Sequence, residues 1–129
     1  MITMRQALRN TAPQKLVTSE PDKGFQNFCP PADFIGFDGH FPNYPILPAM
    51  LQILLGIIVS EELCGTRLTL QKLDKAKFTA QIQPQQTIKV SCRITRSDPG
   101  EGQPTIKARV IITTDEQKAA SMTLFLNQT

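Results

Sequence analysis

The stretch PAMLQILLGIIVSEELC, residues 48–64, decides the fold of this protein. Pro48 suits the first position of a helix and Gly65 suits the position just after its end, so the sequence predicts one helix over residues 48–64. The side chains of this helix are apolar on nearly all of its sides, whereas a surface helix has a polar face. We therefore expect it to be buried on most sides. Gly56 lowers its intrinsic stability by about 1 kcal/mol relative to Ala, and we expect it to let a neighbouring backbone approach closely.

The sequence after this helix changes to an alternation of apolar and polar residues, which is typical of half-buried strands. Turn-forming residues occur at 83–85, 97–102 and 113–116. The pattern predicts an antiparallel meander of about four strands, and an antiparallel sheet wrapped around one apolar helix is the α+β hotdog fold. We expect a single hotdog domain over residues 1–129. The alternating runs are 68–70, 76–82, 88–94, 106–112 and 122–126.

The segment before the helix is rich in proline and glycine. Gly36 and Gly39 and prolines at 42, 45 and 48 exclude a helix and a central strand over most of residues 34–48. A rigid loop of this length is more often functional than not. Further upstream, residues 16–18 and 25–29 have the composition of short strands, and the first 24 residues show little other pattern.

His40 is the only histidine and lies in this loop, eight residues before the predicted helix. Histidine is the commonest general acid or base, although a single histidine is also compatible with a structural or exposed position. Leu47 cannot cap the helix start, so the amides of Ala49 and Met50 are available to a carbonyl that gains negative charge. Water or a loop carbonyl is the alternative partner of these amides.

The segment HFPNYPILPAML, residues 40–51, resembles the His-Phe-Pro-x-x-Pro-(Ile or Val)-x-Pro-Gly-Val-Leu signature of FabA/FabZ-type 3-hydroxyacyl-(acyl-carrier-protein) dehydratases. The wider set of residues 38–42 and 46–48 with Gln52 is similar to the ApeI-like branch, which is linked to aryl-polyene lipid synthesis. Lys77-Phe78 and residues 82–84 also resemble a strand and turn of that family. The resemblance extends from about residue 34 to about residue 90.

The resemblance implies a base, a carbonyl-binding group and a carrier. His40 would abstract the α-proton of a 3-hydroxyacyl thioester, and the amides of Ala49 and Met50 would hold the thioester carbonyl. The substrate would be carried on the phosphopantetheine of an acyl carrier protein or on CoA, with no other cofactor and no metal. The protein would form a homodimer, or a heterodimer with a paralogue. The acyl pocket would be lined by Phe41, Pro48, Leu51, Leu54 and Leu55.

Two positions depart from the family pattern. Ala49 stands where the family has Gly, a mild change because only the backbone N–H is needed, and the second departure affects the chemistry. The family has Glu or Asp fourteen residues after the histidine to protonate the leaving hydroxyl, and this chain has Leu54 there. Such a proton transfer is typically worth about 10²–10⁴ in rate. Asp38 and Gln52 are possible auxiliary residues, although a local turn bond and packing at a dimer contact are their simpler roles. Glu61 lies about 10 Å further along the helix, too far for a simple exchange.

Three functions stay open at this point. The first is a dehydratase-like enzyme acting on acyl thioesters in fatty-acid or related lipid synthesis. The second is an acyl thioesterase or isomerase on the same fold, and the third is a non-catalytic acyl-binding subunit; Leu54 favours these two. An acidic carrier or a phosphate would suit the basic residues Lys75, Lys77, Arg93, Arg96 and Arg109, although exposed Lys and Arg need no such role.

The composition excludes several other classes. Of the 129 residues, 40% are hydrophobic and 19% are charged, which argues against disorder. There is no apolar run long enough for a membrane helix and no signal-like N-terminus. The three cysteines form no CxxC pair, so we expect no zinc site and reduced thiols in the cytoplasm. A net charge of +3, one Tyr and no Trp give little support for nucleic-acid binding.

Overall fold

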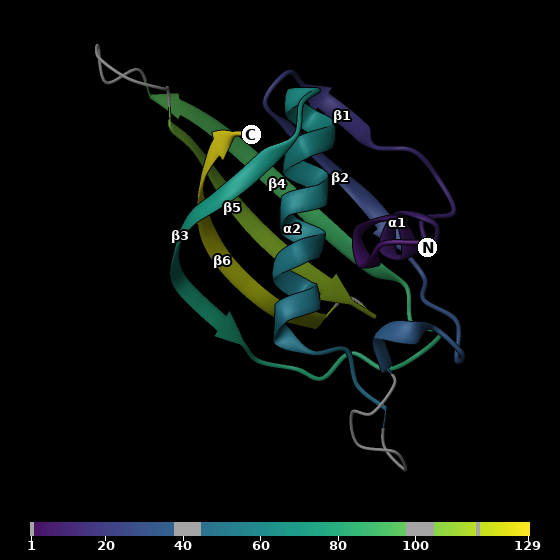
Figure 1. Cartoon of the computed structure of the whole chain (residues 1–129). Helices are drawn as coiled ribbons and strands as arrows, with labels where there is room; N and C mark the ends of the chain where they lie inside the picture. Colours follow the sequence, from purple (N-terminus) through teal and green to yellow (C-terminus); the bar gives the residue numbers. More distant parts are fainter. Residues whose placement is uncertain (1, 38–44, 98–104, 116) are drawn as a thin grey trace.

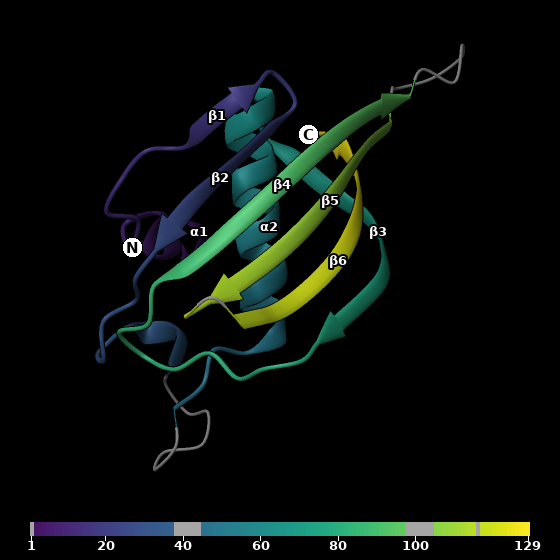
Figure 2. The ribbon, with the colours of Figure 1, turned by 180° about the vertical axis from the view of Figure 1, so that it is seen from behind.

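One antiparallel sheet and one long helix dominate the computed structural model, which describes residues 2–37, 45–97, 105–115 and 117–129. Six strands pair in the order β1-β2-β4-β5-β6-β3, and the sheet curves around α2 (Figures 1 and 2). The predicted α+β hotdog fold is confirmed. The elements are α1 (Met4–Arg9), β1 (Val17–Glu20), β2 (Lys23–Phe28), η1 (Ile35–Phe37), α2 (Ala49–Cys64), β3 (Leu68–Phe78), β4 (Ile88–Ser97), β5 (Thr105–Thr114) and β6 (Gln117–Gln128).

The core lies between α2 and the inner face of the sheet. Alternate residues of β4 and β5 are buried there against the helix, as the period-two pattern predicts, whereas residues 119–124 of β6 are all buried. At Gly56 an added Cβ would lie 3.2 Å from side-chain atoms of Val110 and Leu124. The expectation of a close backbone neighbour was therefore wrong, because it is side chains of β5 and β6 that fill the space beside Gly56.

The ends of α2 lie within one residue of their predicted positions. Pro48 was predicted to be the first helical residue. In the structure it is the N-cap, with φ −63° and ψ 153°. The proline ring restricts only φ, so the extended ψ is what keeps Pro48 outside the helix. Gly65 ends the helix in the left-handed region at φ 71°, where a residue without Cβ is favoured. Within the described ranges, no helix combines the length and apolar character needed to cross a membrane.

Two elements differ from the predicted pattern. β3 runs without a break through Leu68–Phe78, with irregular register between Leu70 and Lys72 and between Asp74 and Lys77, and Lys75 has φ 51°. These irregularities interrupt the alternation, so the sequence shows two shorter runs and places the second too far along the chain. At the N-terminus, α1 was not predicted. Its signal is the capping box in which Thr3 and Gln6 bond each other's backbone amides.

Candidate functional site

The start of α2 opens into a hollow of about 330 Å³. Pro48 provides no side-chain cap, and its carbonyl accepts hydrogen bonds from the amides of Leu51 (3.0 Å) and Gln52 (3.2 Å). The amides of Ala49 and Met50 have no acceptor within the part of the chain that the structure describes. Free donors at the positive end of a helix favour an oxygen that gains negative charge. The hollow is lined by Ile46, Leu47, Pro48, Ala49, Gln52, Phe78, Thr79, Ala80 and Gln81.

Gln52 is the buried polar side chain of this hollow, with 4% of its surface exposed. Its Nε2 donates to the carbonyl of Leu47 at 3.2 Å, and the Leu47 amide donates to the carbonyl of Ile82 at 2.8 Å. Among the described residues, the Oε1 of Gln52 has no hydrogen-bond partner. A buried acceptor without a donor typically costs about 1–3 kcal/mol. The side chain thus positions the loop that enters α2 while one of its own polar atoms stays unpaired.

The predicted acyl-pocket residues lie in different places in the single chain. Pro48 lines the hollow at the helix start. Leu54 lines another hollow, of about 470 Å³, beside Ile57 and the first residues of β3. Leu55 is fully buried in the core, and the Cδ1 of Leu51 lies 2.6 Å from where a Cβ on Gly36 would be. Pro48 and Leu54 therefore line different hollows, since residues six positions apart lie on different sides of a helix with 3.6 residues per turn.

Three predicted residues, Asp38, His40 and Phe41, lie outside the described residues. The described segment before them ends with η1. There Phe37 is buried and packs edge-to-face on Phe34, with ring centroids 5.8 Å apart. The chain after them reaches Leu47, which is buried as well. Of the other predicted residues, Ala49 and Gln52 lie together in the hollow, whereas the Met50 side chain is 80% exposed.

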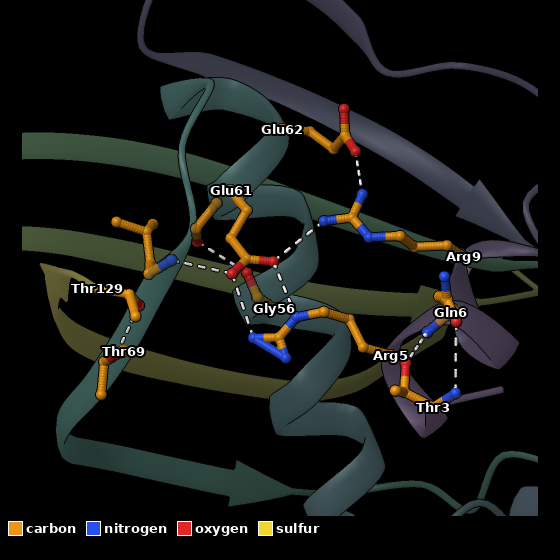
Figure 3. A network of polar contacts seen from close by, with 11 residues as sticks. Thr3, Arg5, Gln6, Arg9, Gly56, Glu61, Glu62, Thr69 and Thr129 are labelled. Carbon is orange, nitrogen blue, oxygen red and sulfur yellow. Dashed lines mark hydrogen bonds and ion pairs between the residues drawn. The ribbon is translucent and has the colours of Figure 1, made fainter. Parts of the chain in front are cut away.

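The opposite end of α2 holds a polar network that the sequence did not reveal. Figure 3 shows Arg5 and Arg9 of α1 reaching Glu61, which is 5% exposed. Arg5 donates from Nε and Nη2 to the two carboxylate oxygens, both at 3.2 Å, and Arg9 donates from Nη2 at 3.0 Å. The amide of Leu68 donates to Oε2 at 2.9 Å. With these partners, the Glu61 carboxylate is a structural link between α1, α2 and β3.

The cysteines form no second site. All three are free thiols. Cys92 lies in the core with its Sγ 3.3 Å from the Oγ of Ser60, and burial raises its pKa to about 11. Burial also raises the pKa of the Cys64 thiol, although the nearby Arg96 opposes this shift. Among the described residues, no group of three or more His, Cys, Asp or Glu could hold a metal ion.

The curved sheet around a single helix makes this a hotdog-fold protein. The model of the ApeI-like family, described as ApeI dehydratase, matches residues 18–122, and the chain belongs to this family. The match includes the His40 motif, the whole of α2 and most of the sheet. The family is thus a family of dehydratases, in agreement with the motif that ends at the start of α2.

Curated relatives carry the name 3-hydroxyacyl-(acyl-carrier-protein) dehydratase FabZ. The Bacillus velezensis protein is 28% identical over 81 residues, which are 57% of this chain and 56% of that protein. The Bacillus subtilis protein is 26% identical over 100 residues, which are 69% of this chain and 70% of that protein. The match to the first of these relatives thus spans little more than half of its length.

Solved structures share the fold. One is the dehydratase heterocomplex ApeI:P from Xenorhabdus doucetiae, with a TM-score of 0.70 and 19% identity over 88% of this chain and 95% of that chain. Another is a hypothetical thioesterase with coenzyme A from Streptococcus pneumoniae TIGR4, with a TM-score of 0.70 and 8% identity over 95% of this chain and 91% of that chain. At these identities the likeness concerns the fold alone.

Proposed function

We propose that this chain is a dehydratase-type enzyme that acts on 3-hydroxyacyl thioesters in fatty-acid or related lipid synthesis. The observation that carries the proposal is the open start of α2, where the amides of Ala49 and Met50 have no acceptor in the described part of the chain. The His40 motif ends directly at this helix start. A general base and free donors side by side are what proton removal next to a carbonyl requires.

In the proposed reaction, the imidazole of His40 removes the α-proton of the bound 3-hydroxyacyl thioester. The electron pair of the broken C–H bond moves toward the carbonyl, whose oxygen gains negative charge. The amide of Ala49 stabilises this charge, and one such donor is typically worth about 3–4 kcal/mol. The enolate then forms the C=C bond as the C–O bond to the 3-hydroxyl breaks, and this oxygen leaves as water after taking up a proton.

Leu54 cannot donate the proton that the leaving hydroxyl requires. Leu54 is half-buried in the hollow beside β3, and Glu61 is bound by two arginines and an amide. We therefore place the acid either on Asp38 or on a second subunit. Gln52 serves as a positioning residue that holds Leu47 and so the entry of the loop into the helix.

A dimer is part of the proposal. β3 is an edge strand of 11 residues, and Leu73 and Phe78 of this strand and Met50 of α2 are exposed apolar side chains. A long edge with exposed apolar residues is a surface that proteins usually cover. A homodimer is the simplest arrangement, and a heterodimer with a paralogue would bring a different set of acids. The Xenorhabdus doucetiae relative in structure is itself described as a heterocomplex.

The test uses a 3-hydroxyacyl thioester, carried on CoA and on acyl carrier protein, with absorbance of the enoyl product and release of free thiol followed in parallel. We expect enoyl formation that falls about 10²–10⁴-fold in His40→Ala. Circular dichroism and sedimentation of the variant show whether its fold and assembly are intact. Full activity of a folded His40→Ala protein would contradict the proposal.

Leu54 supports a second candidate, a thioesterase or a non-catalytic acyl-binding subunit on the same fold. Neither function necessarily needs a carboxylic acid at this position. Thiol release without enoyl formation would favour the thioesterase, and binding of the acyl thioester without turnover would favour the subunit. Acyl carrier protein or CoA is the proposed carrier, and the cytoplasmic location stays a prediction.

A further inference from the structure

A row of cationic side chains crosses the outer face of the sheet, away from α2. Lys23 of β2 is the register partner of Arg93 on β4, and Arg93 is the partner of Arg109 on β5. Their neighbours Cys92 and Val110 face the helix, because Cys92 bonds Ser60 and Val110 lies beside Gly56. Successive residues of a strand point to opposite faces. The three cations therefore share the face that does not contact α2.

The next row of the sheet forms a hollow beside these cations. Ser91 on β4 has Phe25 of β2 as one register partner and Ile111 of β5 as the other. The small Ser91 side chain lies between two large ones, so the surface is hollowed to about 380 Å³ there. Lys89 closes the far side, with its Nζ 4.4 Å from the centre of the Phe25 ring. The result is a concave groove with an apolar wall on each side.

The charge of this outer groove is not balanced within the described part of the chain. Lys23, Lys89, Arg93 and Arg109 line it, and none of the described carboxylates does. Among the described residues, none of these four forms an ion pair, although Glu20 is the register partner of Lys23. Like charges on directly opposed strand positions are destabilising. Arg96, by contrast, is paired with Asp22 in the turn between β1 and β2.

We propose that the outer groove binds a small organic phosphate. The phosphate groups lie on the row Lys23–Arg93–Arg109, because a guanidinium group can donate two parallel hydrogen bonds to the oxygens of one phosphate. The apolar or planar part of the ligand lies between Phe25 and Ile111. The volume is within the range of small-molecule pockets, about 300–1,000 Å³, whereas a protein partner usually meets a broader and flatter surface. This site is separate from the amides at the start of α2.

The basic residues that the sequence analysis considered together lie in different parts of the structure. Arg93 and Arg109 line the outer groove, and Arg109 also donates to the hydroxyl of Thr123 at 3.2 Å. Arg96 is engaged with Asp22, and Lys75 and Lys77 lie on β3. The two cations that complete the site, Lys23 and Lys89, are brought in by strand pairing alone.

The test is calorimetric titration of the full chain with two probes, inorganic pyrophosphate and ATP, at low and at physiological salt. We expect saturable binding that weakens about tenfold or more in the double variant Arg93→Gln/Arg109→Gln. The matched control is Lys107→Gln/Lys118→Gln, which removes the same charge from exposed strand positions that do not line the groove. The control is expected to bind as the wild type does.

A third variant, Ser91→Val, fills the floor of the outer groove without changing any charge, and we expect it to abolish saturable binding. Unchanged binding in Ser91→Val, or equal loss in the control, would mean that the phosphates only follow the net charge and would overturn the proposal. No binding of either probe, or binding only of an acidic protein or a second copy of the chain, would overturn it as well. Tighter binding of ATP than of pyrophosphate would support the role of the apolar walls.

Discussion

The two ends of α2 differ in how their polar groups are hydrogen-bonded. At the C-terminal end, Glu61 receives two arginines and the Leu68 amide, and Gly65 closes the last turn with its amide bonded to the Glu61 carbonyl at 2.8 Å. At the N-terminal end, the amides of Ala49 and Met50 have no partner in the described part of the chain, and Gln52 Oε1 is unpaired. Polar groups are satisfied at one end and left open at the other.

Under the proposed function, this difference separates an end of α2 that stabilises the fold from an end that binds the substrate. Buried polar groups are normally paired, and each exception calls for an explanation. A helix start without a cap gives up about 1 kcal/mol, and in return its donors are available to a substrate oxygen. We therefore expect changes at the N-terminal end to affect activity and changes at the C-terminal end to affect the free energy of unfolding.

The largest expected effect is at Ala49. Ala49→Pro removes one amide hydrogen, and proline is well accepted at the first helical position after an extended residue such as Pro48. We expect kcat for the dehydration to fall about 10²–10³-fold, the usual loss for one such donor, with a melting temperature close to that of the wild type.

Ala49→Gly is the matched control, because it keeps the amide and restores the residue of the family motif. Its activity should equal or exceed that of the wild type. If Ala49→Pro is as active as Ala49→Gly, the amide does not bind the thioester carbonyl and the comparison between the two ends fails.

The next effect concerns Glu61. Glu61→Ala leaves two arginines and the Leu68 amide without their acceptor, and breaking a buried ion pair typically costs about 3 kcal/mol or more. Urea unfolding measures this loss, and kcat of the folded fraction should be unchanged. Glu62→Ala is the control. Glu62 pairs with Arg9 at the surface, and such pairs contribute about 1 kcal/mol or less. Equal losses in the two variants would contradict the assignment.

A smaller effect is expected from pH. Burial raises the pKa of Cys92 to about 11 from 9.0, so the folded state keeps a proton that the unfolded state loses between these values. The resulting stability is present below pH 9 and is lost as the pH rises toward 11, by roughly 2–3 kcal/mol at most. Urea unfolding of the wild type and of Cys92→Ala across this pH range measures the contribution of the thiol. If the free energy of unfolding falls equally steeply with pH in both proteins, the thiol does not lie in a dry interior beside Ser60.

The smallest effect on stability is expected at Gln52. Gln52→Met removes the bond to the Leu47 carbonyl but also removes the unpaired Oε1, so the two changes nearly cancel, to within about 1 kcal/mol. Turnover should fall, because Leu47 and the loop before it lose their link to the helix. An unfolding free energy lowered by more than about 2 kcal/mol would instead place Gln52 among the residues that stabilise the fold.

Much of the fold could be predicted because it follows short-range patterns. The apolar residues of 48–64 predicted a buried helix, and the alternation in 88–94 and 106–112 predicted strands that the structure contains as β4 and β5. α1 was missed because its six residues show little periodicity. β3 was divided because bulges break the alternation on which the prediction rests.

By itself, the sequence determined the central helix, the alternating strands and the motif that leads from His40 to the start of α2, since each of these depends on residues close together in the chain. The tertiary structure decided that Arg5 meets Glu61 across 56 positions and that Lys23, Arg93 and Arg109 form one row. It also decided that Leu54 and Pro48 line different hollows. These features depend on strand register and on how α1 and the sheet pack on α2, and a shift of one residue in register would turn each strand side chain to the other face.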